Sequence, residues 1–236
     1  GTGPLRGYDE TFFGDPGFNQ AEAQVHIGRV RIEHEFGGGL SANGTIQYAD
    51  YDKVYANILP SGLDSTADTV FLGGYRDYTD RENWIGQGNL VWQAGGNTLE
   101  STLLLGFEVS RQDTRNGRDT VSFTRAPGTG GLAPNETPLG ETSFIPPYTL
   151  DAGARLRDSQ LETLSFYLQE QLQIGDHVEL VGGLRWDRFD LDTLDLVGGV
   201  EGDRVDEKVS PRFGVIVKPN RDLSIYASYA ESFLPQ

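Results

Sequence analysis

The chain has 236 residues, with no Cys, no Met, and 19 Lys and Arg against 35 Asp and Glu, which gives a net charge of −16. The absence of Cys excludes disulfide scaffolds, thiolate zinc sites and cysteine nucleophiles. Nucleic acid is an unsuitable partner, because phosphate binding needs a concentrated surface of Lys and Arg. No apolar run approaches the roughly 20 residues of a membrane helix. A β-barrel is compatible with the sequence, because its strands cross lipid with alternating side chains.

The first predicted element is a hairpin over about residues 23–51. Its even positions carry apolar side chains such as Val30, Ile32 and Phe36, and its odd positions are charged or polar. The glycines at 37–39 form the turn between the two strands. Period-two alternation on both sides of a glycine turn predicts an antiparallel sheet with two different faces.

Three further hairpins are predicted over about residues 69–110, 161–189 and 207–233. Within each hairpin the turn is short. Between hairpins we expect long loops, over about residues 52–67, 111–160 and 189–206. Long loops without secondary structure are uncommon in compact domains, whereas short turns on one rim and long loops on the other are typical of outer-membrane barrels.

The two faces of the predicted sheet also favour a membrane barrel. The polar face is rich in Gln, Asn, Ser and Thr instead of Lys and Glu. The apolar face has aromatic residues near strand ends, where a bilayer places an aromatic girdle: these are Trp84, Trp92, Trp186 and Tyr229. Glu170 is the one residue that breaks the apolar pattern of its strand. The alternative is a soluble acidic β-sandwich in which the Trp residues anchor the core.

The predicted topology indicates a part of a larger barrel. If the short turns are periplasmic, both ends of the chain lie on the extracellular side, whereas a complete outer-membrane barrel begins and ends in the periplasm. The missing Met agrees with this expectation. We therefore expect the chain to be a middle part of a barrel.

Several segments resemble successive parts of the barrel of TonB-dependent ferric siderophore receptors, and the first two resemble the catecholate-type branch. They include Phe13-Gly14-Asp15-Pro16, Ile32-Glu33-His34-Glu35-Phe36, the GGLRWDRF segment at 182–189, SPRFG at 210–214 and LSIYASY at 223–229. The resemblance implies an all-β, antiparallel, up-and-down transmembrane barrel of 22 strands, of which about eight are present. The family's plug domain and its TonB-contacting box have no counterpart in this sequence.

The resemblance further implies a function in iron uptake. The protein would bind and import a ferric siderophore across the bacterial outer membrane, in contact with lipid, its own plug domain and TonB. It would be no enzyme, with no catalytic residues, no metal site and no cofactor apart from the transported ferric siderophore. A passive porin or adhesin-type barrel is the alternative from another functional class.

Ligand-binding candidates are chosen for an anionic, aromatic-rich chelate, which suits Arg and aromatic side chains. The predicted long loop over residues 111–160 contains Arg111, Arg115, Arg118, Phe123 and Arg125. The alternative interpretation is an ordinary solvated loop, in which nearby aspartates balance these cations.

Two tyrosines and three lumen-facing residues complete the predicted sites. Tyr51 and Tyr55, at the top of the second strand, offer ring area with a polar end, and the alternative is a place in the aromatic girdle. Arg185, Asp187 and Arg212 share the lumen face, where the resemblance implies charge pairs inside the barrel or contacts with the plug.

Overall fold

The computed structural model describes residues 7–8, 10–140 and 144–233. Eight long strands form one antiparallel sheet, in which each long strand pairs with the long strands that precede and follow it in the chain. They are β1 (Gln20–Gly37), β2 (Leu40–Asp64), β3 (Thr69–Gly96), β4 (Leu99–Phe123), β6 (Tyr148–Ile174), β7 (Val178–Asp195), β8 (Val200–Asn220) and β9 (Leu223–Ala230). A short strand, β5 (Glu136–Pro138), pairs with β3.

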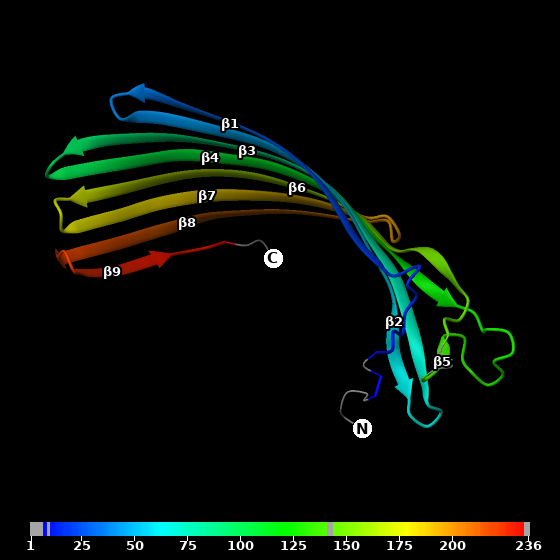
Figure 1. The fold of residues 1–236 in the computed structure, drawn as a ribbon. Helices are drawn as coiled ribbons and strands as arrows, with labels where there is room; N and C mark the ends of the chain where they lie inside the picture. Colours follow the sequence, from blue (N-terminus) through cyan, green and yellow to red (C-terminus); the bar gives the residue numbers. More distant parts are fainter. Residues whose placement is uncertain (1–6, 9, 141–143, 234–236) are drawn as a thin grey trace.

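The sheet is a single curved layer (Figure 1). The turns of the four hairpins lie together at one end, and β2 and β3 bend away at the other end, toward β5. This arrangement confirms the predicted antiparallel fold and the pairing within all four predicted hairpins. A soluble sandwich would need two packed sheets, whereas the strands of the described residues belong to one. Those residues contain no helix long and apolar enough to cross a membrane.

The prediction of long loops over 52–67, 111–160 and 189–206 is wrong for most of these residues. β2 continues to Asp64, β4 to Phe123 and β7 to Asp195, so the connections shrink to 65–68, 124–147 and 196–199. Beyond the apolar part of each strand, both faces carry charged or polar side chains. The alternation of hydrophobicity therefore disappears, although the backbone ladder continues.

One face of the half of the sheet nearest the turns is apolar, and we call it the apolar face. On β4 it runs from Leu99 to Val109, and its side chains are uncovered: Leu105 is 47% and Phe107 45% exposed. This stretch is about 33 Å long at about 3.3 Å per residue. With a strand tilt of about 40° it is about 25 Å tall, which is sufficient for the lipid-facing band of an outer-membrane barrel, and Trp92, opposite Leu103, marks the headgroup level near its turn end.

The opposite face, which we call the polar face, carries Asn43, Thr45, Gln87, Asn89 and Tyr167. Register keeps these positions together, because Asn43 pairs with Asn89 and Thr45 with Gln87. On the apolar face, Tyr48 packs on Trp84 with ring centroids 4.8 Å apart. This pair marks the end of the apolar band, since the next positions along the strands are charged.

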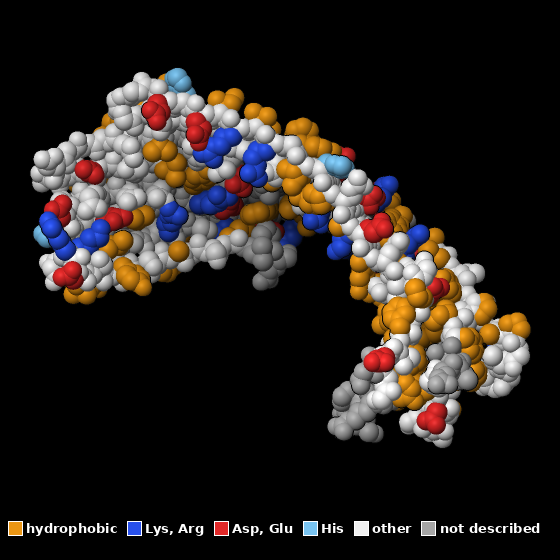
Figure 2. Space-filling model, viewed as in Figure 1, with side chains coloured by type: hydrophobic (Ala, Val, Ile, Leu, Met, Phe, Trp, Pro, Cys, Tyr) orange, Lys and Arg blue, Asp and Glu red, His pale blue; other side chains and the backbone are white. Residues whose placement is uncertain are grey.

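A small hydrophobic core lies at the end of the sheet far from the turns. Ile58, Val70, Leu72 and Val121 are buried there, and residues of 13–18 and of the 124–147 connection pack against them. Asn19 exchanges two hydrogen bonds with the backbone of Ile58, at 2.8 and 3.0 Å. This core fixes the bent ends of β2 and β3. In Figure 2, Lys and Arg side chains lie along the arch up to its bend, and beyond the bend acidic and hydrophobic side chains are seen on this face.

Candidate functional site

A pocket on the polar face, beyond the apolar band, collects cations and tyrosines; we call it the basic pocket. Its volume is about 420 Å³, and β2, β3, β4 and β6 each contribute to it. Strand alternation and register build it, because Tyr55 pairs with Asp77, Asp77 with Arg118, and Arg118 with Arg155. The lining residues are Lys53, Tyr55, Asp77, Tyr78, Thr79, Arg81, Asn116, Arg155 and Arg157.

Asp77 is the charged centre of the basic pocket. Arg118 donates from Nε and Nη2 to the two oxygens of Asp77, at 2.6 and 2.5 Å. Nη2 of Arg155 lies 3.6 Å from the same carboxylate. The hydrogen bond from Arg118 is the main cause that holds the pKa of Asp77 below its ordinary value, and it raises the pKa of Arg118. This bidentate geometry fixes the plane of the guanidinium.

Aromatic rings support the same arginine. The guanidinium carbon of Arg118 lies 4.4 Å from the centroid of the Tyr75 ring, which is a cation–π distance. Tyr75 in turn lies 6.1 Å from Tyr55, between ring centroids. The side chains of Arg118 and Arg155 remain 40% and 50% exposed. Both cations therefore keep surface that a ligand can reach.

The charge balance of the basic pocket is opposite to that of the chain. Five of the chain's 19 Lys and Arg surround it, whereas Asp77 is the one carboxylate of its lining. Asp195 lies next to its rim, opposite Arg157 in register. The five cations are Lys53, Arg81, Arg118, Arg155 and Arg157. The guanidinium groups outnumber the carboxylates, are partly exposed and lie beside tyrosine rings. This combination is suited to an anion with aromatic groups.

The other side of the sheet at the same part of the strands is acidic, and we call it the acidic ledge. It forms a depression of about 680 Å³. Acidic side chains face each other across strands, as Asp52 faces Asp80 and Asp192 faces Asp203. The lining carboxylates are Asp50, Asp80, Glu82, Asp113, Asp158, Asp192, Glu201 and Asp203, with Arg81 and Arg115 among them.

The predicted ligand-binding residues are divided between these two surfaces. Tyr55 lines the basic pocket, Arg118 binds Asp77 beside it, and Tyr51 is on the polar face opposite Arg81 in register. Arg111 and Arg115 lie on the side of the acidic ledge. Arg111 binds Asp113 at 2.8 Å and Glu162 at 3.4 Å, and Arg115 binds Asp158 at 2.6 Å.

The last two predicted loop residues lie apart from both surfaces. Phe123 ends β4 and packs on the hydrophobic core, with its ring 6.1 Å from that of Tyr148. Arg125 is exposed in the 124–147 connection. The expected cluster of Arg111, Arg115, Arg118, Phe123 and Arg125 is thus not one surface, because most of that segment is a strand and sends alternate side chains to opposite faces.

Arg185 and Asp187 form a charge network on the polar face, within the half nearest the turns. Nε of Arg185 donates to Asp187 at 2.7 Å, and Nη2 lies 3.7 Å from Glu108. Ser165 donates to the same carboxylate at 2.6 Å. Arg212 is exposed and lies against Gly183 of β7. The contacts of Arg185 and Asp187 satisfy their charges within the sheet, and contact with a plug stays a prediction.

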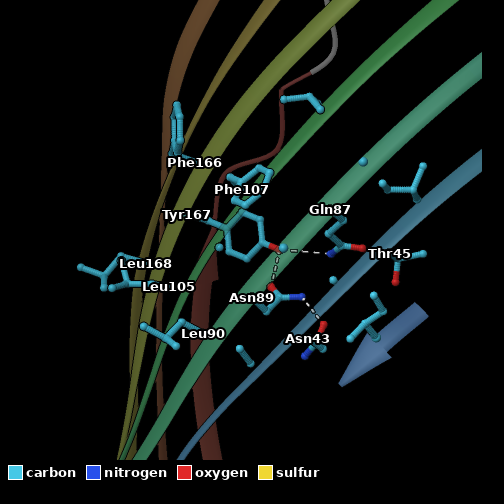
Figure 3. A pocket seen from close by; sticks show the side chains of 18 of the residues that line it. Asn43, Thr45, Gln87, Asn89, Leu90, Leu105, Phe107, Phe166, Tyr167 and Leu168 are labelled. Carbon is cyan, nitrogen blue, oxygen red and sulfur yellow. Dashed lines mark hydrogen bonds between the residues drawn. The ribbon is translucent and has the colours of Figure 1, made fainter. Parts of the chain in front are cut away.

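A depression of about 1160 Å³ extends along the middle of the turn-proximal half (Figure 3). Side chains of the apolar face line it. On the opposite, polar face the same strands carry a polar ladder: Tyr167 donates to Asn89 at 2.6 Å, Gln87 donates to Tyr167 at 3.1 Å, and Asn89 donates to Asn43 at 3.0 Å. The partners of the ladder are one another, so we assign it a structural role.

Sequence reasoning missed most of the basic pocket. Lys53, Asp77, Arg81, Arg155 and Arg157 were not among the predicted residues. The signal was present in the spacing, because Lys53 and Tyr55, like Arg155 and Arg157, are two residues apart and so share a strand face. Interpreting 52–67 and 111–160 as loops removed that periodicity from consideration.

Comparison with known proteins gives the family. A family model described as TonB dependent receptor-like, beta-barrel, matches residues 2–236. The chain belongs to this family. It is a run of neighbouring strands from the wall of an outer-membrane β-barrel, and its apolar face is turned to lipid.

Individual relatives agree with the family. The probable TonB-dependent siderophore receptor PiuA of Acinetobacter baumannii is 25% identical over 240 residues, which cover 95% of this chain and 32% of the relative. The crystal structure of the siderophore receptor PiuA from Acinetobacter baumannii matches with a TM-score of 0.76 at 22% identity, over 93% of this chain and 33% of that chain.

A second solved structure shows the same fold. The ferric-catecholate import receptor Fiu from E. coli K12, in its open form, has a TM-score of 0.74 at 16% identity, over 95% of this chain and 38% of that chain. At these identities the likeness supports the fold alone. The chain spans about a third of the length of the relatives that it matches.

Proposed function

We propose that the protein is an outer-membrane receptor that binds an anionic ferric siderophore at the basic pocket and imports it. The observation that carries this proposal is the surplus of cations beside tyrosine rings on the polar face. Ferric chelates of aromatic siderophores are bulky anions, so they gain from guanidinium donors and ring contacts together. The names of the relatives PiuA and Fiu support the same class of ligand.

The position of the basic pocket fits capture from outside the cell. It lies beyond the apolar band, on the side away from the short turns, which are periplasmic in outer-membrane barrels. The face that carries it is the lumen face of a closed barrel. Import would then proceed through the lumen, with a plug domain and TonB as partners. We propose no catalytic activity and no resident cofactor.

The test uses the full-length protein with two matched pairs of substitutions. Arg118→Ala with Arg155→Ala removes two cations of the basic pocket, and Arg111→Ala with Arg115→Ala removes two on the outer side. We expect the first pair to weaken binding of an iron-loaded catecholate siderophore by about tenfold to a hundredfold, since charged hydrogen bonds contribute about 1.5–3 kcal/mol. The second pair is expected to leave affinity unchanged.

Binding is measured by quenching of intrinsic fluorescence, and import by uptake of radioactive iron in cells with and without TonB. Loss of affinity in the outer pair, with none in the pocket pair, would contradict the assignment of the site. Import that continues without TonB would favour a passive porin instead.

A further inference from the structure

Glu170 is a carboxylate on the lipid-facing surface that neither the fold nor the proposed function explains. Register aligns it with Leu103 of β4 and Gly182 of β7, both on the apolar face. Leu168 and Leu172 flank it on its own strand and face the same way. A charged side chain on the lipid-facing surface of a membrane protein destabilises the folded state unless a partner balances its charge.

The protein itself supplies Glu170 with one partial partner. Ser101 of β4 donates its hydroxyl to Oε1 of Glu170 at 2.5 Å. Within the described ranges, this is the one hydrogen bond of the carboxylate, and no Lys, Arg or His lies within ion-pair distance of it. The negative charge is therefore oriented by a neutral group but not balanced by a cation.

Space for an outside group is open beside Glu170. Its neighbour in register on β7 is Gly182, and a methyl group built there would meet no atom within 4 Å. The next residue across the sheet is Phe213 of β8, which is exposed. A small headgroup can therefore approach the carboxylate from the β7 side without displacing a side chain.

The depth of Glu170 suits the boundary between acyl chains and headgroups. It is about 13 Å along the strand from Ile174, which ends β6, or about 10 Å in depth at a tilt of about 40°. The same row of opposed residues contains Trp92 of β3, and Trp marks the headgroup level in membrane proteins. A lipid cation is available at this level, on the side of the short turns.

We infer that Glu170, held by Ser101, binds the primary ammonium of an ethanolamine phospholipid on the outer wall of the barrel. The ammonium brings the missing positive charge and up to three N–H donors. A choline headgroup brings the charge without an N–H donor, and a glycerol headgroup brings no cation. The expected order of preference is ethanolamine, then choline, then glycerol.

The experiment is native mass spectrometry of the full-length protein in detergent. The protein is incubated with an equimolar mixture of phosphatidylethanolamine and phosphatidylcholine, and separately with an equimolar mixture of phosphatidylethanolamine and phosphatidylglycerol. The wild type is expected to retain ethanolamine lipid in excess. Glu170→Gln should reduce the ratio of retained ethanolamine to choline lipid by about threefold, as for an exposed charged pair, and Ser101→Ala should reduce it by less. Folding of each variant is checked by its heat-dependent migration on gels.

The matched control is Glu100→Gln, which neutralises a glutamate near the same turn end but on the polar face of β4. It should leave the lipid ratio unchanged. Equal retention of the two lipids by the wild type would overturn the inference, as would an unchanged ratio in Glu170→Gln. An equal fall in Glu100→Gln would also overturn it, because net charge would then be the cause.

Discussion

Asp77 holds two arginines of the basic pocket in place before any ligand arrives. Its bidentate pair with Arg118, and the packing of Arg118 on Tyr75, mean that the guanidinium does not have to be ordered on binding. Ordering a flexible side chain at an interface costs about 0.5–1.5 kcal/mol. Asp77 is therefore a positioning residue for the proposed ligand.

Asp77→Asn is expected to weaken binding of the anionic chelate by about twofold to tenfold, because Arg118 would lose its fixed orientation. Asp158→Asn, which frees Arg115 on the acidic ledge, is the matched control and should leave affinity unchanged. Titration of the chelate followed by fluorescence measures both. Tighter binding by Asp77→Asn would show that removal of the negative charge outweighs positioning.

The pKa of Asp77 also fixes the sign of a pH effect. The hydrogen bond from Arg118 lowers this pKa below the ordinary value of 3.8. The stabilisation from the ion pair is therefore complete above 3.8, and it is lost only as the pH falls through the lowered pKa. Affinity of the wild type should be constant between about pH 5 and pH 8 as far as Asp77 contributes.

β4 shows how glycine and tyrosine positions build a strand of this sheet. A methyl group at Gly106 would lie 2.2–2.6 Å from atoms of the Tyr167 ring, so the ring covers the glycine on the neighbouring strand. The same relation holds at Gly117, where a methyl group would lie 2.3 Å from Tyr78. These glycines are required by the close approach of a ring, and cross-strand pairs of this kind stabilise sheets.

Gly106→Ala should displace Tyr167 and break its hydrogen bonds to Asn89 and Gln87. The expected loss is about 1 kcal/mol for each bond, which should lower the temperature at which the folded protein loses its compact migration on gels. Gly28→Ala, at a strand position where a methyl group meets no atom within 4 Å, is the control. Equal thermal stability of both variants would contradict this role of Gly106.

The strands also show what the sequence could and could not predict. Around Val30 and Phe107 the alternation is strong because one face meets lipid, so hairpins and turns were predictable. Around Tyr55 and Arg118 both faces of the sheet are polar. Apolar and polar side chains therefore do not alternate there, and alternation cannot reveal the strand. The basic pocket further depends on pairing between β4 and β6, whose register shifts between Arg118 and Thr120. A single sequence does not encode that long-range register in any local pattern.

The described sheet has two free edges and an uncovered apolar face. β1 and β9 each pair on one side only, and β1 exposes Val30 and Ile32. Unpaired strand edges and large apolar surfaces lead to association in water. The expectation of a membrane barrel and the rejection of a soluble sandwich depend on this property of the molecule.

Expressed alone, residues 1–236 should be recovered as insoluble protein, or as mixed oligomers that need detergent. Fractionation in the presence and absence of detergent, followed by light scattering, measures this directly. The full-length protein in detergent is the control and should be uniform in mass. A stable monomer of residues 1–236 in plain buffer would contradict the assignment of the apolar face to lipid.

The basic pocket and the acidic ledge occupy opposite sides of a wall that is one sheet thick. An anion that diffuses toward the rim of the barrel is therefore repelled along the exterior and attracted toward the interior. Such a field does not have to tighten the final complex, because it acts on the rate of encounter. At about 0.1 M salt the field is screened over a distance of about 10 Å. The difference in charge across the wall therefore speeds the capture of anions from dilute solution. High ionic strength weakens this effect.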